Sequence, residues 1–167
     1  MRCVSTREPQ AEGVALCEAI ALGLARDGGL FVPRALPAVR VEDGALEQVA
    51  AAVLAPFFAG EPLGEQLGAI CAAAFSFPAP VVPLGGDHLL ELFHGPTAAF
   101  KDFGARFLAE CLTRLGVEQT ILVATSGDTG AAVAAAFHRR PGMRVVILYP
   151  KGRVSGRQEH QLGAFGD

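Results

Sequence analysis

The sequence is poor in lysine. Of its 14 lysine and arginine residues only Lys101 and Lys151 are lysines, and tryptophan is absent. It has no basic cluster interleaved with aromatic residues, which argues against a nucleic-acid partner. No apolar run reaches the roughly 18 residues of a membrane span, and the N-terminal segment lacks the apolar core of a secretion signal. We therefore expect a cytoplasmic protein with neither a membrane nor a nucleic-acid partner.

Cysteine is also scarce, and its spacing does not indicate a redox or metal site. Cys3, Cys17, Cys71 and Cys111 are widely spaced and form no CxxC pair. Three of them lie in apolar helical patterns, so we expect reduced core residues rather than redox or metal groups. The four histidines show no metal-ligand spacing. With 51% hydrophobic and 19% charged residues, the chain has the composition of a packed globular protein.

The pattern of apolar residues changes at the segment SFPAP, residues 76–80. Before it, apolar residues recur at helical spacing in three stretches, the second with Asp43 as a plausible cap and the third with Leu67, Ile70, Cys71 and Ala74 on one face. We expect a helical N-terminal domain over residues 1–80 and the start of an α/β domain over residues 81–167.

The second part alternates apolar runs with helical patterns. Residues 120–125 and 144–149 are predicted to be buried parallel strands. A long helix is expected to precede them, with Thr97 as its N-cap and Gly116 as its stop. Another is expected near residues 131–139, and a last one in SGRQEHQLGAF. So few parallel strands leave both sheet edges exposed, so we expect the chain to be a portion of a longer protein.

Lys101 is unusually placed, in the segment AAFKDFG at the expected start of a helix. The helix end is mildly unfavourable for a cation, and the neighbouring Phe100 and Phe103 remove water. Such a lysine has a lowered pKa and is a good nucleophile toward an aldehyde. The alternative is a structural lysine whose stem packs on the two rings. Asp102 fits both interpretations, as an acid in the first helical turn.

The loop ATSGDTGAA joins an expected buried strand to a helix N-terminus. Its backbone N–H groups, the hydroxyls of Ser126 and Thr129 and the helix dipole favour an anion, at the strand end where open α/β sheets bind ligands. The pattern does not choose between a phosphate and a carboxylate. Alternatively, Asp128 is a plain cap and the hydroxyls bond only within the turn.

Together, ELFHGPTAAFKDFGARF and ATSGDTGAAVAAAF resemble the threonine synthase family, pyridoxal-phosphate enzymes of the tryptophan-synthase β fold group. STRE, GLARDGGLFVP, FSFPAP and VVILYPKGRVSGRQEHQL match that family's pattern too, so the resemblance runs from about Val4 to Gly163. It implies the fold of the fold type II pyridoxal-phosphate enzymes, a helical N-terminal unit followed by a partial three-layer parallel-sheet domain.

The resemblance also implies a function, the conversion of O-phospho-L-homoserine and water to L-threonine and phosphate. Lys101 would form the internal aldimine with pyridoxal 5'-phosphate and then serve as base and acid. Residues Ser126, Gly127, Asp128 and Thr129 would face the substrate carboxylate and the cofactor ring, with Asp128 where related enzymes often carry asparagine. His94 and Thr97 would line the pocket, although His94 could equally hydrogen-bond the backbone.

Some family features lie beyond the sequence. The glycine-rich loop that cradles the cofactor phosphate, and the partner of the pyridine nitrogen, follow residue 167 in the family's pattern. We therefore expect these residues alone to be inactive. Two alternatives remain open: a related phospho-lyase that releases a keto acid, and a non-catalytic truncated module. The sequence makes no prediction of the oligomeric state.

Overall fold

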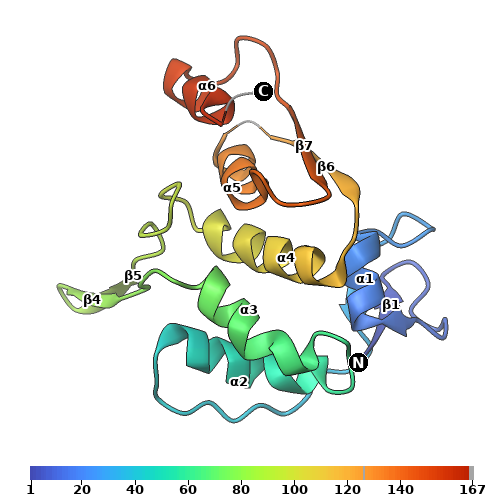
Figure 1. The fold of residues 1–167 in the computed structure, drawn as a ribbon. Helices are drawn as coiled ribbons and strands as arrows, with labels where there is room; N and C mark the ends of the chain where they lie inside the picture. Colours follow the sequence, from blue (N-terminus) through green and yellow to red (C-terminus); the bar gives the residue numbers. More distant parts are fainter. Residues whose placement is uncertain (126, 166–167) are drawn as a thin grey trace. The chain divides into compact units, whose positions relative to one another are not determined.

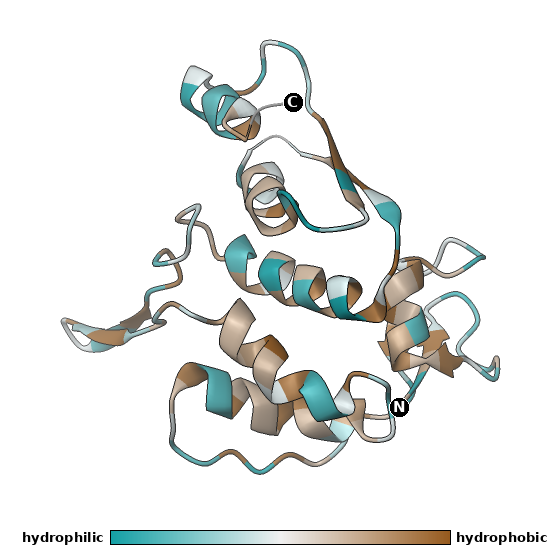
Figure 2. Cartoon of the chain, in the orientation of Figure 1, coloured by the Kyte–Doolittle hydropathy of each residue, from teal (hydrophilic) through white to brown (hydrophobic). Residues whose placement is uncertain are grey.

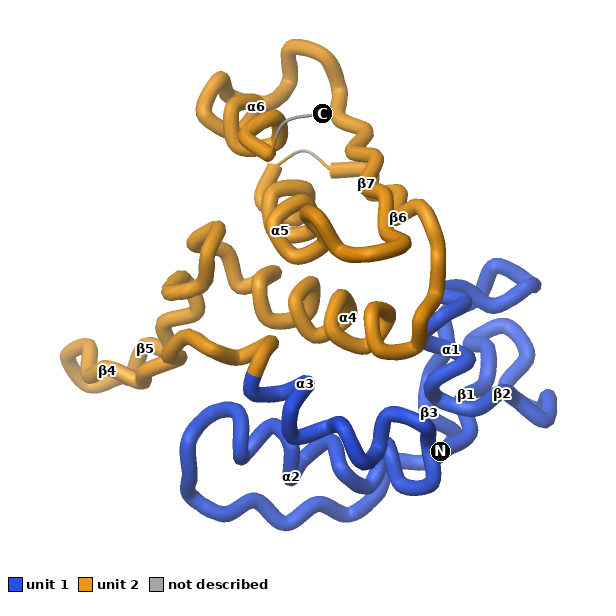
Figure 3. Tube along the Cα trace, viewed as in Figure 1, with its two compact units in different colours: residues 1–72 blue, residues 73–167 orange. Residues whose placement is uncertain are grey.

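The computed structural model describes residues 1–125 and 127–165 and combines helices with three small sheets (Figure 1). This confirms the α/β class expected from the sequence. The chain forms two compact units, residues 1–72 and residues 73–167 (Figure 3). Within the described ranges, no helix is both long enough and apolar enough to cross a membrane.

The first unit contains an antiparallel sheet of order β2-β1-β3, made by Arg2–Ser5 (β1), Val14–Ala15 (β2) and Phe31–Pro33 (β3). Its helical segments are Leu16–Leu22 (α1), Leu46–Phe58 (α2), the 3-10 turn Gly64–Gln66 (η1) and Leu67–Ala74 (α3), whose last residues belong to the second unit. The sequence predicted the helices but not the sheet. Strands of two to four residues are too short to show an alternating pattern.

Two helix starts in this unit differ from the sequence-based expectation. The first helical stretch, EGVALCEAIALGLA, was expected to include Val14 on its apolar face, but α1 starts at Leu16, where the Glu61 carboxylate accepts the N–H groups of Leu16 and Cys17. The second helix, α2, begins after an Ala45 N-cap, so the prediction of Asp43 as its cap was wrong. Here the side chain of Gln48 reaches back to the Ala45 N–H, which leaves a cap at Asp43 without a role.

The apolar face predicted for α3 is confirmed. Leu67, Ile70, Cys71 and Ala74 are each at most 4% exposed. All four cysteines are buried, as the sequence indicated. Burial raises the pKa of the Cys71 thiol, which keeps it protonated and unreactive at neutral pH.

The second unit contains the hairpin Val81–Leu84 (β4) and Asp87–Leu90 (β5) and continues through three helices that alternate with two strands. These are Lys101–Leu115 (α4), Gln119–Ala124 (β6), Asp128–Phe137 (α5), Met143–Leu148 (β7) and Gly156–Gly163 (α6). Strands β6 and β7 pair in parallel, from Gln119 opposite Met143 to Ala124 opposite Leu148. Parallel pairing at these positions was predicted and is confirmed.

Helix α5 covers the sheet and also packs against α4. It is rich in alanine and mostly apolar (Figure 2), and small side chains let a helix approach its neighbours closely. Burial alternates along both strands, so one face of the sheet lies under α5. The other face exposes Leu122, Val146 and Leu148. The described residues thus contain two of the three expected layers.

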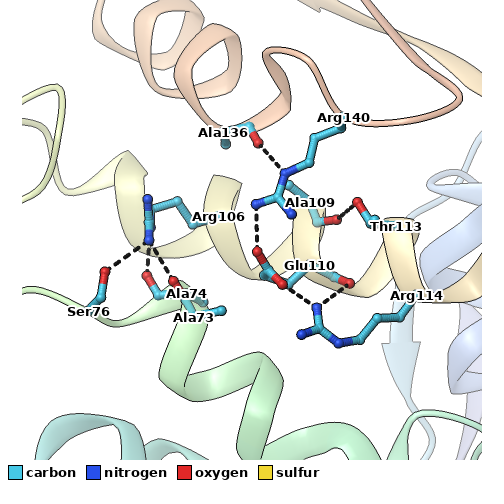
Figure 4. A network of polar contacts seen from close by, with 10 residues as sticks. All are labelled: Ala73, Ala74, Ser76, Arg106, Ala109, Glu110, Thr113, Arg114, Ala136 and Arg140. Atoms are coloured by element: carbon cyan, nitrogen blue, oxygen red, sulfur yellow. Dashed lines mark hydrogen bonds and ion pairs between the residues drawn. The ribbon is translucent and has the colours of Figure 1, made fainter.

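A buried acid ties α4 to the end of α5. Glu110, 6% exposed, receives hydrogen bonds from the guanidinium groups of Arg114 and Arg140, and Arg140 also donates to the Ala136 carbonyl (Figure 4). Burial alone would raise the pKa of Glu110, but the two arginines outweigh burial and lower it. One carboxylate therefore joins the helix that starts at Lys101 to the helix that follows the glycine-containing loop.

The end of α3 is held by another α4 side chain. Arg106 donates from Nε to the Ala74 carbonyl at 2.8 Å, and from its terminal nitrogen to the Ala73 carbonyl and the Ser76 hydroxyl (Figure 4). A cation at a helix C-terminus satisfies free carbonyls and complements the helix dipole. Arg106 thereby fixes the segment that leads into the second unit.

Candidate active site

Lys101 is the first residue of α4, as the sequence suggested, but the cap is different. The N-cap is Phe100, with no side-chain hydrogen bond to the helix. Thr97 was predicted to be the cap; this is wrong, because the helix begins four residues later and the Thr97 hydroxyl donates to Asp102 instead of accepting a helical N–H. The expected helix stop at Gly116 is confirmed, with a left-handed φ of 66°.

The amine of Lys101 lies over one aromatic ring. Its Nζ atom is 4.3 Å from the centroid of Phe100, whose side chain is 58% exposed. Phe103 packs elsewhere, with its ring centroid 4.8 Å from that of Phe77 and 6.2 Å from that of Phe75. Lys101 is half-buried, so its amine is held against a ring at the edge of solvent, where a small molecule can reach it.

Asp102 has a role that the sequence did not reveal. Its side chain is 1% exposed, and it accepts hydrogen bonds from both the N–H and the hydroxyl of Thr97, at 2.9 and 2.8 Å. A carboxylate placed only for the helix dipole would lie in solvent. The spacing of Thr97 and Asp102 is the one sequence signal that could have suggested their contact.

His94 is held by a carboxylate. Its Nε2 atom lies 2.6 Å from Oε2 of Glu91, and its ring packs against Phe93 at 4.7 Å between centroids. From the sequence, a hydrogen bond from His94 to the backbone remained an alternative, and Glu91 was not predicted as its partner. Because both side chains are partly exposed, this pair is free to meet a ligand.

The glycine-containing loop leads directly into α5. The helix begins at Asp128, three residues earlier than predicted, after Gly127, whose N–H donates to the Thr125 hydroxyl at 3.1 Å. Asp128 is exposed and Thr129 is half-buried. Ser126, also expected at the site, lies outside the described residues. In the first turn of α5 the Gly130 N–H donates to the Gly127 carbonyl at 3.1 Å, and N–H groups at a helix start favour an anion.

Two glycines fix this loop through close packing. A Cβ atom at Gly127 would lie 2.5 Å from Nε2 of Gln158, in α6. At Gly130 it would lie 2.7 Å from Cδ2 of Leu162 and still closer to the methyl of Thr125. Gly130 therefore lets α5 press against both its own loop and α6. The sequence did not reveal this packing role of the two glycines.

The predicted site residues lie at the starts of α4 and α5 and in the segment before α4. Helices α4 and α5 pack against each other. Thr97 donates a hydrogen bond to Asp102, the residue that follows Lys101, and His94 is hydrogen-bonded to Glu91. Among the described residues, no cluster of three or more His, Cys, Asp or Glu side chains could hold a metal ion. The arrangement offers an amine, an anion-binding helix start and a histidine–carboxylate pair.

Comparisons with known proteins identify the family. Residues 88–166 match the sequence profile of the family described as "Pyridoxal-phosphate dependent enzyme", and residues 2–75 match that described as "Threonine synthase N terminus". The chain is 48% identical over 166 residues to the threonine synthase of Escherichia coli (strain K12), and the alignment covers 93% of this chain and 38% of that protein. With the Haemophilus influenzae threonine synthase it shares 43% identity over 173 residues, covering 99% and 40%.

Solved structures give the same result. The crystal structure of threonine synthase from Escherichia coli superposes with a TM-score of 0.91 at 42% identity, covering 100% of this chain and 41% of that one. The pyridoxal-phosphate-bound threonine synthase from Brucella melitensis gives 0.84 at 38% identity, covering 96% and 38%. The class is that of the pyridoxal-phosphate-dependent enzymes. Within it, the chain belongs to the threonine synthase family and spans about two-fifths of the length of these relatives.

Proposed function

We propose that the polypeptide containing this chain converts O-phospho-L-homoserine and water to L-threonine and phosphate, with pyridoxal 5'-phosphate bound covalently at Lys101. The observation that carries the proposal is the position of Lys101, at the start of α4 with its amine over the Phe100 ring. The relatives named as threonine synthases favour this reaction over the phospho-lyase and the non-catalytic module.

The residues present fit this cofactor. An aldehyde requires an accessible primary amine, and Lys101 is half-buried beside an exposed ring. The chain has only one other lysine, Lys151, which is exposed next to a turn. The family resemblance assigns the cofactor's phosphate and pyridine nitrogen to partners beyond residue 167, so we propose that the chain supplies the amine and part of the substrate site.

In the proposed reaction Lys101 would hold the cofactor, and its amine would be free to act once the substrate is bound. When bound, pyridoxal phosphate would accept the electron pair that is left when a proton departs from the substrate. The amine of Lys101 would remove protons from Cα and Cβ, and protons would return to Cγ and Cα. Phosphate leaves from Cγ and water adds at Cβ, so the atoms of substrate and water are all found in threonine and phosphate.

The loop before α5 is proposed to bind the substrate carboxylate. N–H groups in the first turn of a helix favour an anion, and we assign this role to Ser126, Gly127, Asp128 and Thr129. We further propose that His94 and Thr97 line the pocket. The hydrogen bond between His94 Nε2 and the Glu91 carboxylate supports this by fixing the orientation of the imidazole ring.

The location and domain organisation are also proposals. Four buried thiols are typical of a reducing cytoplasm. We propose that residues 1–80 form the N-terminal domain and residues 81–167 begin a cofactor-binding domain of fold type II. The profile matches over residues 2–75 and 88–166 support this division.

Borohydride reduction tests the assignment of Lys101. The polypeptide should show an absorbance band in the near-ultraviolet to visible range with the cofactor, and reduction should attach the cofactor to the FKDFG peptide. Lys101→Arg should abolish both the label and turnover, while the matched variant Lys151→Arg should keep them. Labelling of the Lys151 peptide instead, or normal turnover by Lys101→Arg, would refute the proposal.

A further inference from the structure

We propose that Asp102 is a positioning residue for Lys101: by holding Thr97, its buried carboxylate closes the loop of residues 95–100 and fixes the backbone from which the amine projects. This inference rests on the proposed role of Lys101. It adds a residue that does not itself touch the cofactor or substrate.

The burial of Asp102 shows that its place is decided by the loop. With 1% exposure, the carboxylate has lost its water, and both oxygens take their donors from the single residue Thr97. A buried carboxylate is costly unless donors replace the lost water. An acid that only complemented the helix dipole would do so equally well while exposed to solvent. The two hydrogen bonds to Thr97, which we call the latch, therefore account for the burial of Asp102.

The loop that this latch closes is strained. Ala98 has a φ of 56°, in the left-handed region that residues with a Cβ atom avoid. Two turns surround it, in which the Ala98 N–H donates to the Gly95 carbonyl and the Asp102 N–H to the Ala99 carbonyl. Such a conformation persists only where surrounding contacts hold it. The two Thr97–Asp102 bonds are contacts of this kind.

Gly95 completes the latch. A Cβ atom at this position would lie 2.8 Å from Cβ of Asp102 and closer still to its carboxylate. Glycine therefore allows the carboxylate to lie directly against the loop backbone. The segment HGPTAAFKD can then be understood in physical terms: glycine makes room, threonine donates twice, and the aspartate accepts both bonds.

The consequence for Lys101 is geometric. Lys101 lies between Thr97 and Asp102 in sequence and directly precedes Asp102. The direction of its Cα–Cβ bond is therefore set by the closed loop. A covalently bound cofactor inherits that direction. Because small misplacement of a reacting group costs much of its rate, opening the latch should reduce cofactor capture by Lys101 without altering the lysine itself.

The experiment measures capture of pyridoxal phosphate by the cofactor-free polypeptide, followed by borohydride reduction and quantification of both lysine peptides. Capture at Lys151 serves as the internal reference. Asp102→Ala should slow capture at Lys101 by at least tenfold relative to Lys151. Thr97→Val, which removes the hydroxyl and keeps the shape, should slow it several-fold, and Thr97→Ser should restore it to within twofold of wild type.

Thr113→Val is the matched control. It also removes a threonine hydroxyl from α4, one that donates to the Ala109 carbonyl at 2.7 Å, but far along the helix from Lys101. It should lower the melting temperature while leaving the ratio of capture at the two lysines unchanged. Unchanged ratios in Asp102→Ala and Thr97→Val, with the melting temperature lowered, would show a merely structural role and overturn the inference.

The wild-type arm separates this inference from the proposed function. If the wild-type polypeptide captures no pyridoxal phosphate at Lys101, both the function and the positioning role are wrong. If the wild type is labelled at Lys101 and the variants behave like it, only the positioning role is wrong. Should Asp102→Ala fail to fold, the comparison of Thr97→Val with Thr97→Ser decides the matter alone.

Discussion

Arg140 donates a hydrogen bond to Glu110 across 2.5 Å, although the two residues are 30 positions apart in sequence. The same carboxylate receives Arg114 from its own helix. One side chain therefore fixes α4 against the end of α5, and with them the two helix starts that carry the candidate site.

Replacing this acid should weaken the fold. Glu110→Gln removes the charge and leaves two guanidinium groups without their carboxylate, so the free energy of unfolding should fall by about 2 kcal/mol. This is below the usual cost of breaking a buried pair, because both arginines are partly exposed. Urea unfolding measures it. Glu118→Gln, at an exposed position, should change stability by less than about 0.5 kcal/mol, and an equal loss in both variants would contradict the assignment.

The contribution of Glu110 should also depend on pH. Burial opposes its ionisation, but the arginines lower its pKa below the usual value of about 4.3. A lowered native pKa means that the stabilisation is complete above the unfolded pKa and is lost as pH falls through the native one. The stability difference between wild type and Glu110→Gln should therefore be constant above about pH 5 and shrink progressively below pH 4. A difference that stays the same down to pH 3 would show that the pKa is not lowered.

Gly130 should not tolerate a methyl group. The added Cβ atom of Gly130→Ala would meet Leu162 at 2.7 Å and the Ile147 side chain at 3.2 Å, an overpacking that costs about 1–3 kcal/mol. Gly104→Ala is the contrasting control, since a Cβ there meets nothing within 4 Å and alanine favours a helix interior by roughly 0.5–1 kcal/mol. Thermal unfolding of the two variants should shift in opposite directions. A stabilised Gly130→Ala would mean that α5 and α6 are not in contact.

The loop should serve the substrate more than the cofactor. In the polypeptide containing this chain, Thr129→Ala should raise the KM for O-phospho-L-homoserine by roughly tenfold, the cost of a lost hydroxyl hydrogen bond to a charged group. Asp128→Ala, which leaves the backbone N–H groups in place, should also weaken substrate use more than cofactor retention. The cofactor absorbance band should persist, because Lys101 is untouched. Neither side chain is fully buried, so both variants should fold. Complete loss of bound cofactor from a folded variant would place the loop at the cofactor instead.

Regular features of the fold could be predicted from the sequence. The buried face of α3 follows from one apolar spacing, and the parallel strands follow from two apolar runs flanked by turn residues. The short strands were not predicted, because residues such as Val14 and Ala15 fit a helical repeat as well as a strand. Their true state is decided by pairing with β1, which the local sequence does not encode.

The candidate site was predictable only in part. Lys101 was conspicuous because lysine is rare and the segment around it is aromatic. The contact of Asp102 with Thr97 was not visible, since the left-handed turn between them falls on Ala98, where no glycine or asparagine announces it. Glu91 was missed because an acid near a histidine is common on any surface. Such pairings depend on the path of the loop, and that path is set by tertiary contacts.

The parallel pairing of β6 with β7 also has a kinetic consequence. Since Gln119 pairs with Met143 and every later pair keeps the same separation, a single closure of the chain around α5 brings the whole ladder into register. The strands cannot pair without that crossover, and the helix buries its apolar residues partly against these strands. Segment 119–148 should therefore behave as one cooperative folding unit, whose amide protons exchange with solvent together rather than strand by strand.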